Sequence, residues 1–422
     1  MRKIHLLSLL AAAVLSLSAW AQTAYITTPT AIYSTSATAE SPLSFTDNGR
    51  SLQLNGKTLA TKEIDSITFY LPDVTCVGGD ISLLTEYEQR GAKYSTNDGT
   101  AISDVLTFFQ QEGWNALRLR LFVNPANASE DVRKEGVVQD INYVCELGKR
   151  IKEQGFLLML DFHYSDSWAD PGKQTVPADW ASLDIEGLTE KMYSYTKDCL
   201  TKMKDAGATP DFIQIGNEIT YGLLWPTAHT YPGGGGQDGG TWTNLKSYLN
   251  NAAKACREMC PDAKIILHTE LSNANNPANF YQQAKQYGID YDIIGLSYYP
   301  AYHGSLSTLD GALSKIESQQ PDRPIMIVET GYSNKWAMAG TTFDYTSVYP
   351  YSEDGQESFT KDLVTTLKKH KNVKGILWWW AEANEYGINW QNSVTSGWNN
   401  ASLFNNETGR ALKALSQLKE LK

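Results

Sequence analysis

Two glutamates each stand directly after a short apolar run, and their side chains could do acid and base chemistry. Glu218 ends the stretch Ile213-Gln-Ile-Gly-Asn-Glu218, and Glu329 ends Ile325-Met-Ile-Val-Glu329. A parallel barrel presents its catalytic groups at the C-terminal ends of buried strands, where these residues would lie. Two carboxyl groups are also what hydrolysis of a glycosidic bond requires. Either glutamate alone could instead pair with an arginine or cap a helix, but their joint occurrence favours a catalytic pair.

The chain from about residue 73 onward alternates short apolar runs with helical periodicity. The helical segments include residues 138–151, which Gly155 closes, and residues 359–367. Alternating strands and helices favour a parallel sheet, and eight such units favour a closed (β/α)8 TIM barrel over an open doubly wound sheet. No glycine-rich phosphate motif follows the first run, which argues against nucleotide binding. The eight expected strands are residues 74–79, 116–123, 156–162, 212–216, 265–268, 293–298, 325–328 and 376–379.

Two arginines lie on one face of the second expected strand. Arg118 and Arg120 alternate with leucines, so both should point toward the barrel interior. A buried guanidinium is costly unless an acceptor receives it, so the two arginines imply acidic partners inside the barrel mouth. Glu218 and Glu329 are the candidates.

Three other strand ends concentrate polar and aromatic groups. The third strand ends in the stretch from Asp161 to Asp170, which we expect to contact a ligand. The sixth ends in Tyr298, whose hydroxyl could hydrogen-bond a nucleophilic carboxylate and hold it ionised. The eighth ends in three consecutive tryptophans, residues 378–380, which cannot all point into a barrel. We expect at least one to pack against helices and another to lie under a sugar ring.

Charge, cysteines and the first residues limit the class of protein. The formal net charge of −11 argues against nucleic acid or an anionic surface as a partner and favours a neutral substrate. Five cysteines show no metal-binding spacing, and we expect Cys256 and Cys260, four apart on a helix, to pack in the core or form a pair. Residues 1–21 have the basic start, apolar stretch and small-x-small end of a signal peptide. We therefore expect a secreted monomer, periplasmic or extracellular, with no membrane span.

Residues 22–72 differ in amino-acid composition from the rest of the chain. They are rich in Thr, Ser and Ala, and Asn55-Gly56 separates two alternating segments, which predicts a β-hairpin. We expect a small, partly flexible β appendage here, followed by a catalytic barrel over residues 73–422.

The chain also resembles glycoside hydrolase family 53, the endo-β-1,4-galactanases of the clan A (β/α)8 barrels. The likeness covers residues 78–415. Asn-Glu after the fourth strand is shared across the clan, whereas Asp-Phe-His-Tyr-Ser-Asp and Gly-Leu-Leu-Trp-Pro are specific to this family. The motifs that carry it are Gly-Gly79-Asp-Ile-Ser82, Leu117-Arg-Leu-Arg-Leu-Phe-Val-Asn-Pro125, Asp161-Phe-His-Tyr-Ser-Asp-Ser-Trp-Ala-Asp-Pro171, Gln214-Ile-Gly-Asn-Glu218, Gly222-Leu-Leu-Trp-Pro226, Gly295-Leu-Ser-Tyr-Tyr-Pro300, Val328-Glu-Thr330 and Asp354-Gly-Gln356.

The resemblance implies a role for each candidate residue. Glu218 would be the general acid/base and Glu329 the nucleophile of a retaining reaction on β-1,4-galactan, with a raised pKa for Glu218 and a lowered one for Glu329. No cofactor is expected for catalysis, and a structural calcium cannot be read from the sequence. The remaining roles are contact of Asn217 with the 2-hydroxyl, orientation of Glu329 by Arg118 or Arg120 with Tyr298, and substrate binding by His163, Asp166, Trp168 and Trp379.

Two departures from the family pattern concern the outer sugar subsites. This chain reads His268-Thr-Glu270-Leu-Ser where the family often has His-Leu-Asp-Asn-Gly, and Trp380-Ala381 where a Glu-Pro pair is common. These departures leave product length and any structural calcium open and do not affect the reacting pair. Two alternative functions also stay open. One is another clan A β-glycanase, a mannanase or cellulase, and the other is a non-catalytic glycan-binding barrel.

Overall fold

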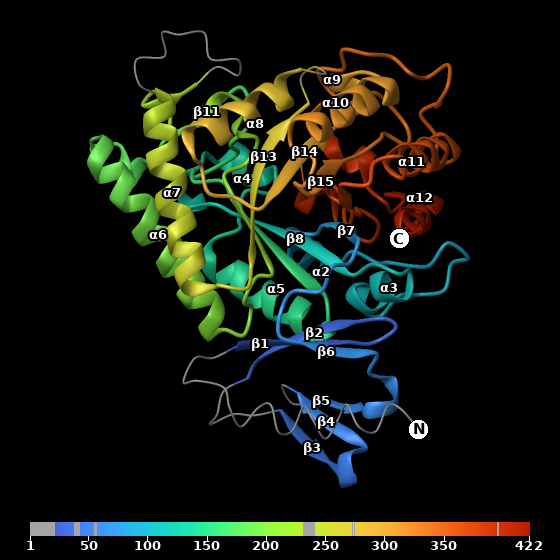
Figure 1. Cartoon of the computed structure of the whole chain (residues 1–422). Coiled ribbons are helices and arrows are strands. Elements are labelled where there is room, and N and C mark those ends of the chain that lie inside the picture. The colour runs from blue at the N-terminus through green and yellow to red at the C-terminus, as the bar shows by residue number, and fades with distance from the viewer. Residues whose placement is uncertain are drawn as a thin grey trace.

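Eight parallel strands close into one barrel around the centre of the molecule (Figure 1). The computed structural model describes residues 22–37, 43–54, 57–230, 241–271, 273, 275–394 and 396–422. The predicted signal peptide lies outside these residues. The strands are joined in the order β10, β13, β14, β15, β16, β7, β8 and β9, with helices between them, so the predicted (β/α)8 barrel is confirmed.

All eight predicted strands form, each overlapping its expected range. They are β7 (Cys76–Asp80), β8 (Ala116–Leu121), β9 (Leu157–Phe162), β10 (Phe212–Ile215), β13 (Lys264–Glu270), β14 (Ile293–Tyr298), β15 (Ile325–Thr330) and β16 (Val373–Trp378). The helices are α2 (Leu84–Arg90), α3 (Val105–Gln111), α4 (Glu130–Lys134), α5 (Ile141–Gln154), α6 (Ile185–Asp205), α7 (Thr241–Met259), α8 (Asn276–Tyr287), α9 (Pro300–His303), α10 (Leu306–Gln319), α11 (Glu353–Leu367) and α12 (Lys413–Gln417). A two-residue ladder, β11 (Gly222–Leu223) with β12 (Ala228–His229), lies after β10.

Local sequence signals explain how the helices begin and end. The Asp140 carboxylate accepts a hydrogen bond from the Tyr143 N–H and so caps α5. Gly155 ends the same helix in the left-handed region, at φ 89°, which favours glycine. A side chain there would also collide with Tyr33 and Ala31 of the N-terminal segment, so this end of α5 depends on close packing as well.

The barrel interior is apolar at its lower end and polar at its upper end. Ala116, Leu157, Met159, Phe212 and Ile266 belong to one buried cluster at the beginning of the strands. Because strand side chains alternate, the same inward faces carry polar groups two or four residues further along the strands. Those groups are Arg118 and Arg120 on β8, Asp161 on β9, Gln214 on β10 and His268 on β13, all fully buried.

Two small sheets precede the barrel. The order β2-β1-β6 joins β2 (Ile32–Ala37), β1 (Gln22–Thr27) and β6 (Ser66–Thr68), and β3-β4-β5 joins β3 (Ser44–Thr46), β4 (Ser51–Leu54) and β5 (Lys57–Ala60). Leu54 pairs with Lys57 across the antiparallel pair β4 and β5, which confirms the predicted pairing of these two segments. The turn residues themselves, 55–56, lie outside the described residues. Figure 1 places β1, β2 and β6 directly beneath the barrel.

The sheet β2-β1-β6 closes the lower end of the barrel. Tyr25 and Ile32 lie in the same apolar cluster as Leu157 and Met159, and the Ile32 N–H donates to the Gly155 carbonyl at 2.8 Å. The Tyr25 hydroxyl lies close to Asp211, and burial together with the charge of Asp211 raises the pKa of Tyr25. Asp211 also pairs with the buried ammonium of Lys152. The sheet is therefore packed into the barrel floor, at the end opposite the strand C-termini.

Replacing Tyr25 by alanine is expected to lower the free energy of unfolding by about 3 kcal/mol, because the ring leaves a cavity in this floor. Tyr25→Phe removes only the hydroxyl and should cost about 1 kcal/mol. Urea denaturation followed by circular dichroism would measure both values. An unchanged midpoint for Tyr25→Ala would show that the sheet β2-β1-β6 does not unfold together with the barrel.

Candidate active site

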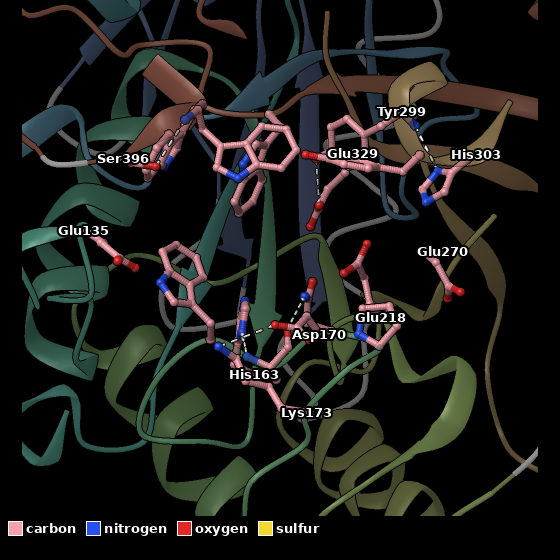
Figure 2. Close-up of a pocket in the computed structure, with 18 residues that line it drawn as sticks. Glu135, His163, Asp170, Lys173, Glu218, Glu270, Tyr299, His303, Glu329 and Ser396 are labelled. Atoms are coloured by element: carbon pink, nitrogen blue, oxygen red, sulfur yellow. Dashed lines mark hydrogen bonds and ion pairs between the residues drawn. The ribbon is translucent and has the colours of Figure 1, made fainter. Parts of the chain in front are cut away.

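A cavity of about 450 Å³ opens at the C-terminal ends of the strands (Figure 2). Figure 2 shows Glu218 and Glu329 pointing toward each other across it. Six of the ten residues predicted for the site line this cavity, two lie beneath it and two do not reach it. The six are His163, Trp168, Asn217, Glu218, Glu329 and Trp379.

Three side chains hold the carboxylate of Glu329 at the end of β15. The guanidinium of Arg118 pairs with its Oε1 at 2.8 Å. The Tyr299 hydroxyl donates to Oε2 at 3.0 Å, and the Ser297 hydroxyl donates to the same oxygen at 3.4 Å. Each of these contacts favours the ionised form of Glu329.

The assignment of Tyr298 to this role is wrong by one residue. The Tyr298 hydroxyl donates to the carbonyl of Gly304 at 2.9 Å, away from the cavity. Neighbouring residues of a strand point to opposite faces, and Ser297 already faces inward. Tyr299, two residues after Ser297, therefore returns to the inner side. The inward polar position of Ser297 was the sequence signal that could have identified Tyr299.

Glu218 stands in a different environment. It adopts the left-handed region, at φ 47°, and its N–H donates to Nδ1 of His268 at 3.2 Å. A residue other than glycine in this region carries strain of the kind that clusters at functional sites. Among the described residues, no lysine or arginine forms an ion pair with Glu218, in contrast to Glu329.

Burial sets the protonation of the two carboxyl groups. It raises the pKa of Glu218 well above its usual range, and the charge of Glu329 raises it further. Burial also raises the pKa of Glu329 to about 7, although Arg118 and Tyr299 oppose the rise. The expected lowering for Glu329 is therefore wrong, because burial outweighs the opposing effect of Arg118, and the charges of Asp161 and Asp80 add to the rise. The expected order survives, so Glu329 ionises first and Glu218 keeps its proton.

The two arginines lie under the cavity and are fully buried, as the alternation of β8 predicted. Arg118 pairs with Asp80 at 3.0 Å and with Asp161 at 2.7 Å, in addition to Glu329. Arg120 pairs with the other oxygen of Asp80, at 3.0 Å, and within the described residues forms no ion pair with either glutamate. Asp80 and Asp161 are thus the partners that sequence reasoning missed. Their inward positions on β7 and β9 follow from the same alternation.

Arg120 supports an aromatic wall. Its guanidinium lies over the rings of Trp168, Trp379 and Trp380, at 4.8, 5.1 and 5.7 Å from their centroids. These three rings line the cavity together with Trp398, a further residue that sequence reasoning missed. Trp378 instead packs in the core and donates its indole N–H to a backbone carbonyl. Flat aromatic faces of this kind suit sugar rings.

His163 and Asn217 are fixed by neighbouring backbone groups. The His163 Nδ1 accepts a hydrogen bond from the Ala169 N–H at 3.1 Å, which leaves Nε2 facing Asp161 at 3.1 Å. Asn217 donates from Nδ2 to the Ala169 carbonyl at 2.8 Å and accepts at Oδ1 from Arg118 at 3.0 Å. Both side chains are almost fully buried at the cavity floor.

Asp166 does not line the cavity. Its carboxylate accepts hydrogen bonds from Asn127 at 3.0 Å and from the Ala178 N–H at 2.9 Å. It therefore ties two loops together, which is the usual task of a loop aspartate. A substrate contact for Asp166 is not what the structure indicates.

The structure shows neither a metal-binding cluster nor a disulfide within the described ranges. No group of three or more His, Cys, Asp or Glu side chains there could hold a metal ion. All five cysteines are unpaired, and Cys256 and Cys260 are buried in the core. No helix among the described residues is long and apolar enough to cross a membrane.

Comparison with known proteins places this site in a family. The sequence profile of glycosyl hydrolase family 53 matches residues 76–418. An arabinogalactan endo-β-1,4-galactanase of Thermothelomyces thermophilus is 31% identical over 72% of this chain and 89% of its own length. An endo-β-1,4-galactanase of Bacillus subtilis is 30% identical over 72% of this chain and 68% of its own.

The fold agrees with the sequence match. The solved family 53 catalytic domain of Ignisphaera aggregans superposes with a TM-score of 0.71 at 30% identity, covering 82% of this chain and 96% of that domain. The profile spans the barrel and both carboxylates of the cavity. This chain is a glycosidase and belongs to glycosyl hydrolase family 53.

Proposed function

We propose that this protein hydrolyses β-1,4-galactosidic bonds in galactan and type I arabinogalactan, the side chains of pectin, by a retaining double displacement. The substrate is that named for the relatives from Thermothelomyces thermophilus and Bacillus subtilis. One observation carries the assignment of roles. Glu329 is held by Arg118 and Tyr299, whereas no described lysine or arginine pairs with Glu218, whose pKa is raised well above its usual range.

In the first half of the reaction, Glu218 gives its proton to the glycosidic oxygen while the Glu329 carboxylate attacks the anomeric carbon. The bond to the leaving sugar breaks, and an ester forms between Glu329 and the remaining chain. In the second half, the Glu218 carboxylate takes a proton from a water molecule whose oxygen attacks the anomeric carbon. The ester bond to Glu329 breaks, which releases the sugar and restores both groups.

The cavity walls supply binding. Trp379, Trp168 and Trp398 offer faces on which sugar rings can stack. Asn217 Nδ2 has two hydrogens, of which one is bonded to the Ala169 carbonyl, so the other can reach the 2-hydroxyl of the reacting sugar. We further propose that the enzyme is secreted, on the basis of the signal-peptide pattern of residues 1–21 and of a polymeric substrate.

A hydrolysis panel on galactan, β-mannan and cellulose tests the substrate. We expect reducing ends to appear from galactan at a rate at least about a hundredfold above the other two, because specificity for one sugar depends on hydroxyl contacts that the others cannot make. Proton NMR of early products should show the β-anomer first. Faster release from mannan or cellulose would favour the alternative clan A activity, and no hydrolysis of galactan would overturn the proposed substrate.

The neighbouring tyrosines 298 and 299 form a matched pair of variants. Tyr299→Phe removes a donor to Glu329 and should raise the pKa of this carboxyl, so the acidic limb of kcat/KM should move to higher pH by about 1 and the maximum should fall about tenfold. The sign follows because activity needs ionised Glu329 and is lost as pH falls through its pKa. Tyr298→Phe breaks only the bond to Gly304 and should keep kcat/KM within about threefold. Equal pH profiles for the two variants would contradict the role of Tyr299.

A further inference from the structure

Ser297 lies on β14 between the two glutamates and is fully buried. Its hydroxyl is 3.4 Å from Oε2 of Glu329, and it also lies close enough to the carboxyl group of Glu218 to oppose the rise in pKa that burial causes there. The contact to Glu329 is longer than the 3.0 Å contact made by Tyr299 to the same oxygen. The single hydrogen of the Ser297 hydroxyl therefore lies near two carboxyl groups and can be donated to either one.

His268 holds the oxygen of this hydroxyl in place. Two N–H donors converge on Nδ1 of His268, the backbone of Glu218 at 3.2 Å and the amide of Gln214 at 3.0 Å. The Asn217 oxygen near the same nitrogen already accepts from Arg118, at 3.0 Å. Two donors require an acceptor, so Nδ1 carries no hydrogen and the hydrogen of the neutral ring is on Nε2.

The tautomer of His268 decides where the Ser297 hydrogen can go. Nε2 of His268 lies 2.8 Å from the Ser297 oxygen and donates to it. Burial and the nearby charge of Arg118 lower the pKa of His268 well below its usual range, so the ring stays neutral. Because Nε2 donates to one lone pair of the Ser297 oxygen, the Ser297 hydrogen must point away from His268, and the acceptors near it are the carboxyl groups of Glu329 and Glu218.

We propose that Ser297 is a positioning residue whose hydroxyl hydrogen turns from Glu329 to Glu218 and back within each turnover, following the negative charge. This inference rests on the retaining mechanism proposed above. In the free enzyme the charge is on Glu329. When Glu329 becomes an ester, the proton of Glu218 has gone to the leaving oxygen and the charge is on Glu218. The hydrogen never leaves Ser297, and only the direction of its O–H bond changes.

Such a hydroxyl stabilises each carboxylate only while that carboxylate is charged. A hydrogen bond to an ionised acceptor is stronger than one to a neutral acceptor, so the O–H direction follows the charge without an added step. In the contacts that the structure gives, the Tyr299 hydroxyl hydrogen-bonds Glu329 and not Glu218. It therefore cannot stabilise both carboxylates in this way.

Carbon NMR titration of the two glutamate carboxyls tests the proposal, in the free enzyme and in the glycosyl-enzyme trapped with a fluorinated galactoside. Ser297→Ala should raise the pKa of Glu329 in the free enzyme and of Glu218 in the trapped enzyme, each by about 1. Ser333→Ala is the matched control, because Ser333 is equally buried past the end of β15 and its hydroxyl has no hydrogen-bond partner among the described residues. It should change neither pKa.

The outcomes separate this inference from the proposed function. A change at Glu329 alone would show a fixed donor and overturn the turning hydroxyl, and no change at either carboxyl would overturn any electrostatic role of Ser297. If the fluorinated galactoside fails to label Glu329 in the wild-type protein, the retaining mechanism is wrong, and the inference about Ser297 is then wrong as well. Should Ser297→Ala not fold, Ser297→Cys keeps a weaker donor in place, and we expect smaller changes in the same direction at both carboxyls.

Discussion

Replacing Glu329 by alanine is expected to lower the rate of galactan hydrolysis by about 10⁴-fold or more, because the variant has no group to form the covalent intermediate. Glu218→Ala should lower it by about 10³-fold or more on the polymer, because the leaving sugar then departs without a proton. Both variants should fold, since the carboxyls face a cavity and Arg118 keeps Asp80 and Asp161 as partners after Glu329 is lost. The measurement is the release of reducing ends, with circular dichroism to verify the fold.

Glu135 provides the control for both variants. It also lines the cavity, but Figure 2 places it at the far side from the two glutamates. Glu135→Gln should leave kcat within about threefold of the wild-type value, because it removes a charge and no catalytic group. Hydrolysis by Glu329→Ala or Glu218→Ala at more than about a tenth of the wild-type rate would rule out the catalytic assignment.

Azide is expected to rescue the two variants with opposite stereochemistry. A substrate with an activated leaving group needs no proton, so Glu218→Ala should form the glycosyl-enzyme quickly and then stall, since no base activates water. Azide needs no base and should attack this intermediate to give a β-glycosyl azide. In Glu329→Ala azide can only replace the missing nucleophile, and any product should be the α-glycosyl azide.

The anomeric configuration of the azide product, measured by NMR, decides the roles. An α product from the Glu218 variant with a β product from the Glu329 variant would mean that acid/base and nucleophile are exchanged. Absence of rescue in both variants, together with release of an α-anomeric sugar by the native enzyme, would mean inversion instead of retention. The wild-type enzyme with the same activated substrate and azide is the control, and it should give the free sugar as its main product.

Several features of the site could be predicted because they depend on local pattern alone. The eight strands follow from apolar runs bounded by helical periodicity, and a carboxylate placed just after such a run must lie near the barrel mouth. The inward direction of Arg118 and Arg120 follows from strand alternation, and their complete burial confirms it. The antiparallel pairing of β4 with β5 follows in the same way from the sequence of the segment that joins them.

Other features depend on which strand lies beside which, and on where each strand ends. Tyr298 and Tyr299 have the same side chain, and only the inward direction of Ser297 shows which hydroxyl reaches Glu329. The acidic partners of the arginines, Asp80 and Asp161, come from strands on either side of β8, whose neighbours in space are set by barrel closure.

The sequence by itself therefore determined the barrel, its family resemblance and the pair of glutamates at its mouth. Only the tertiary structure decided the pKa of Glu329, since this value balances burial against a charge that Arg118 shares with two other carboxylates. The packing of Tyr25 against the lower end of the barrel likewise became visible only in the tertiary structure. The physical reason is the same in each case. Alternation and apolar runs are local properties, whereas burial and charge pairing are sums over neighbours that are distant in the chain.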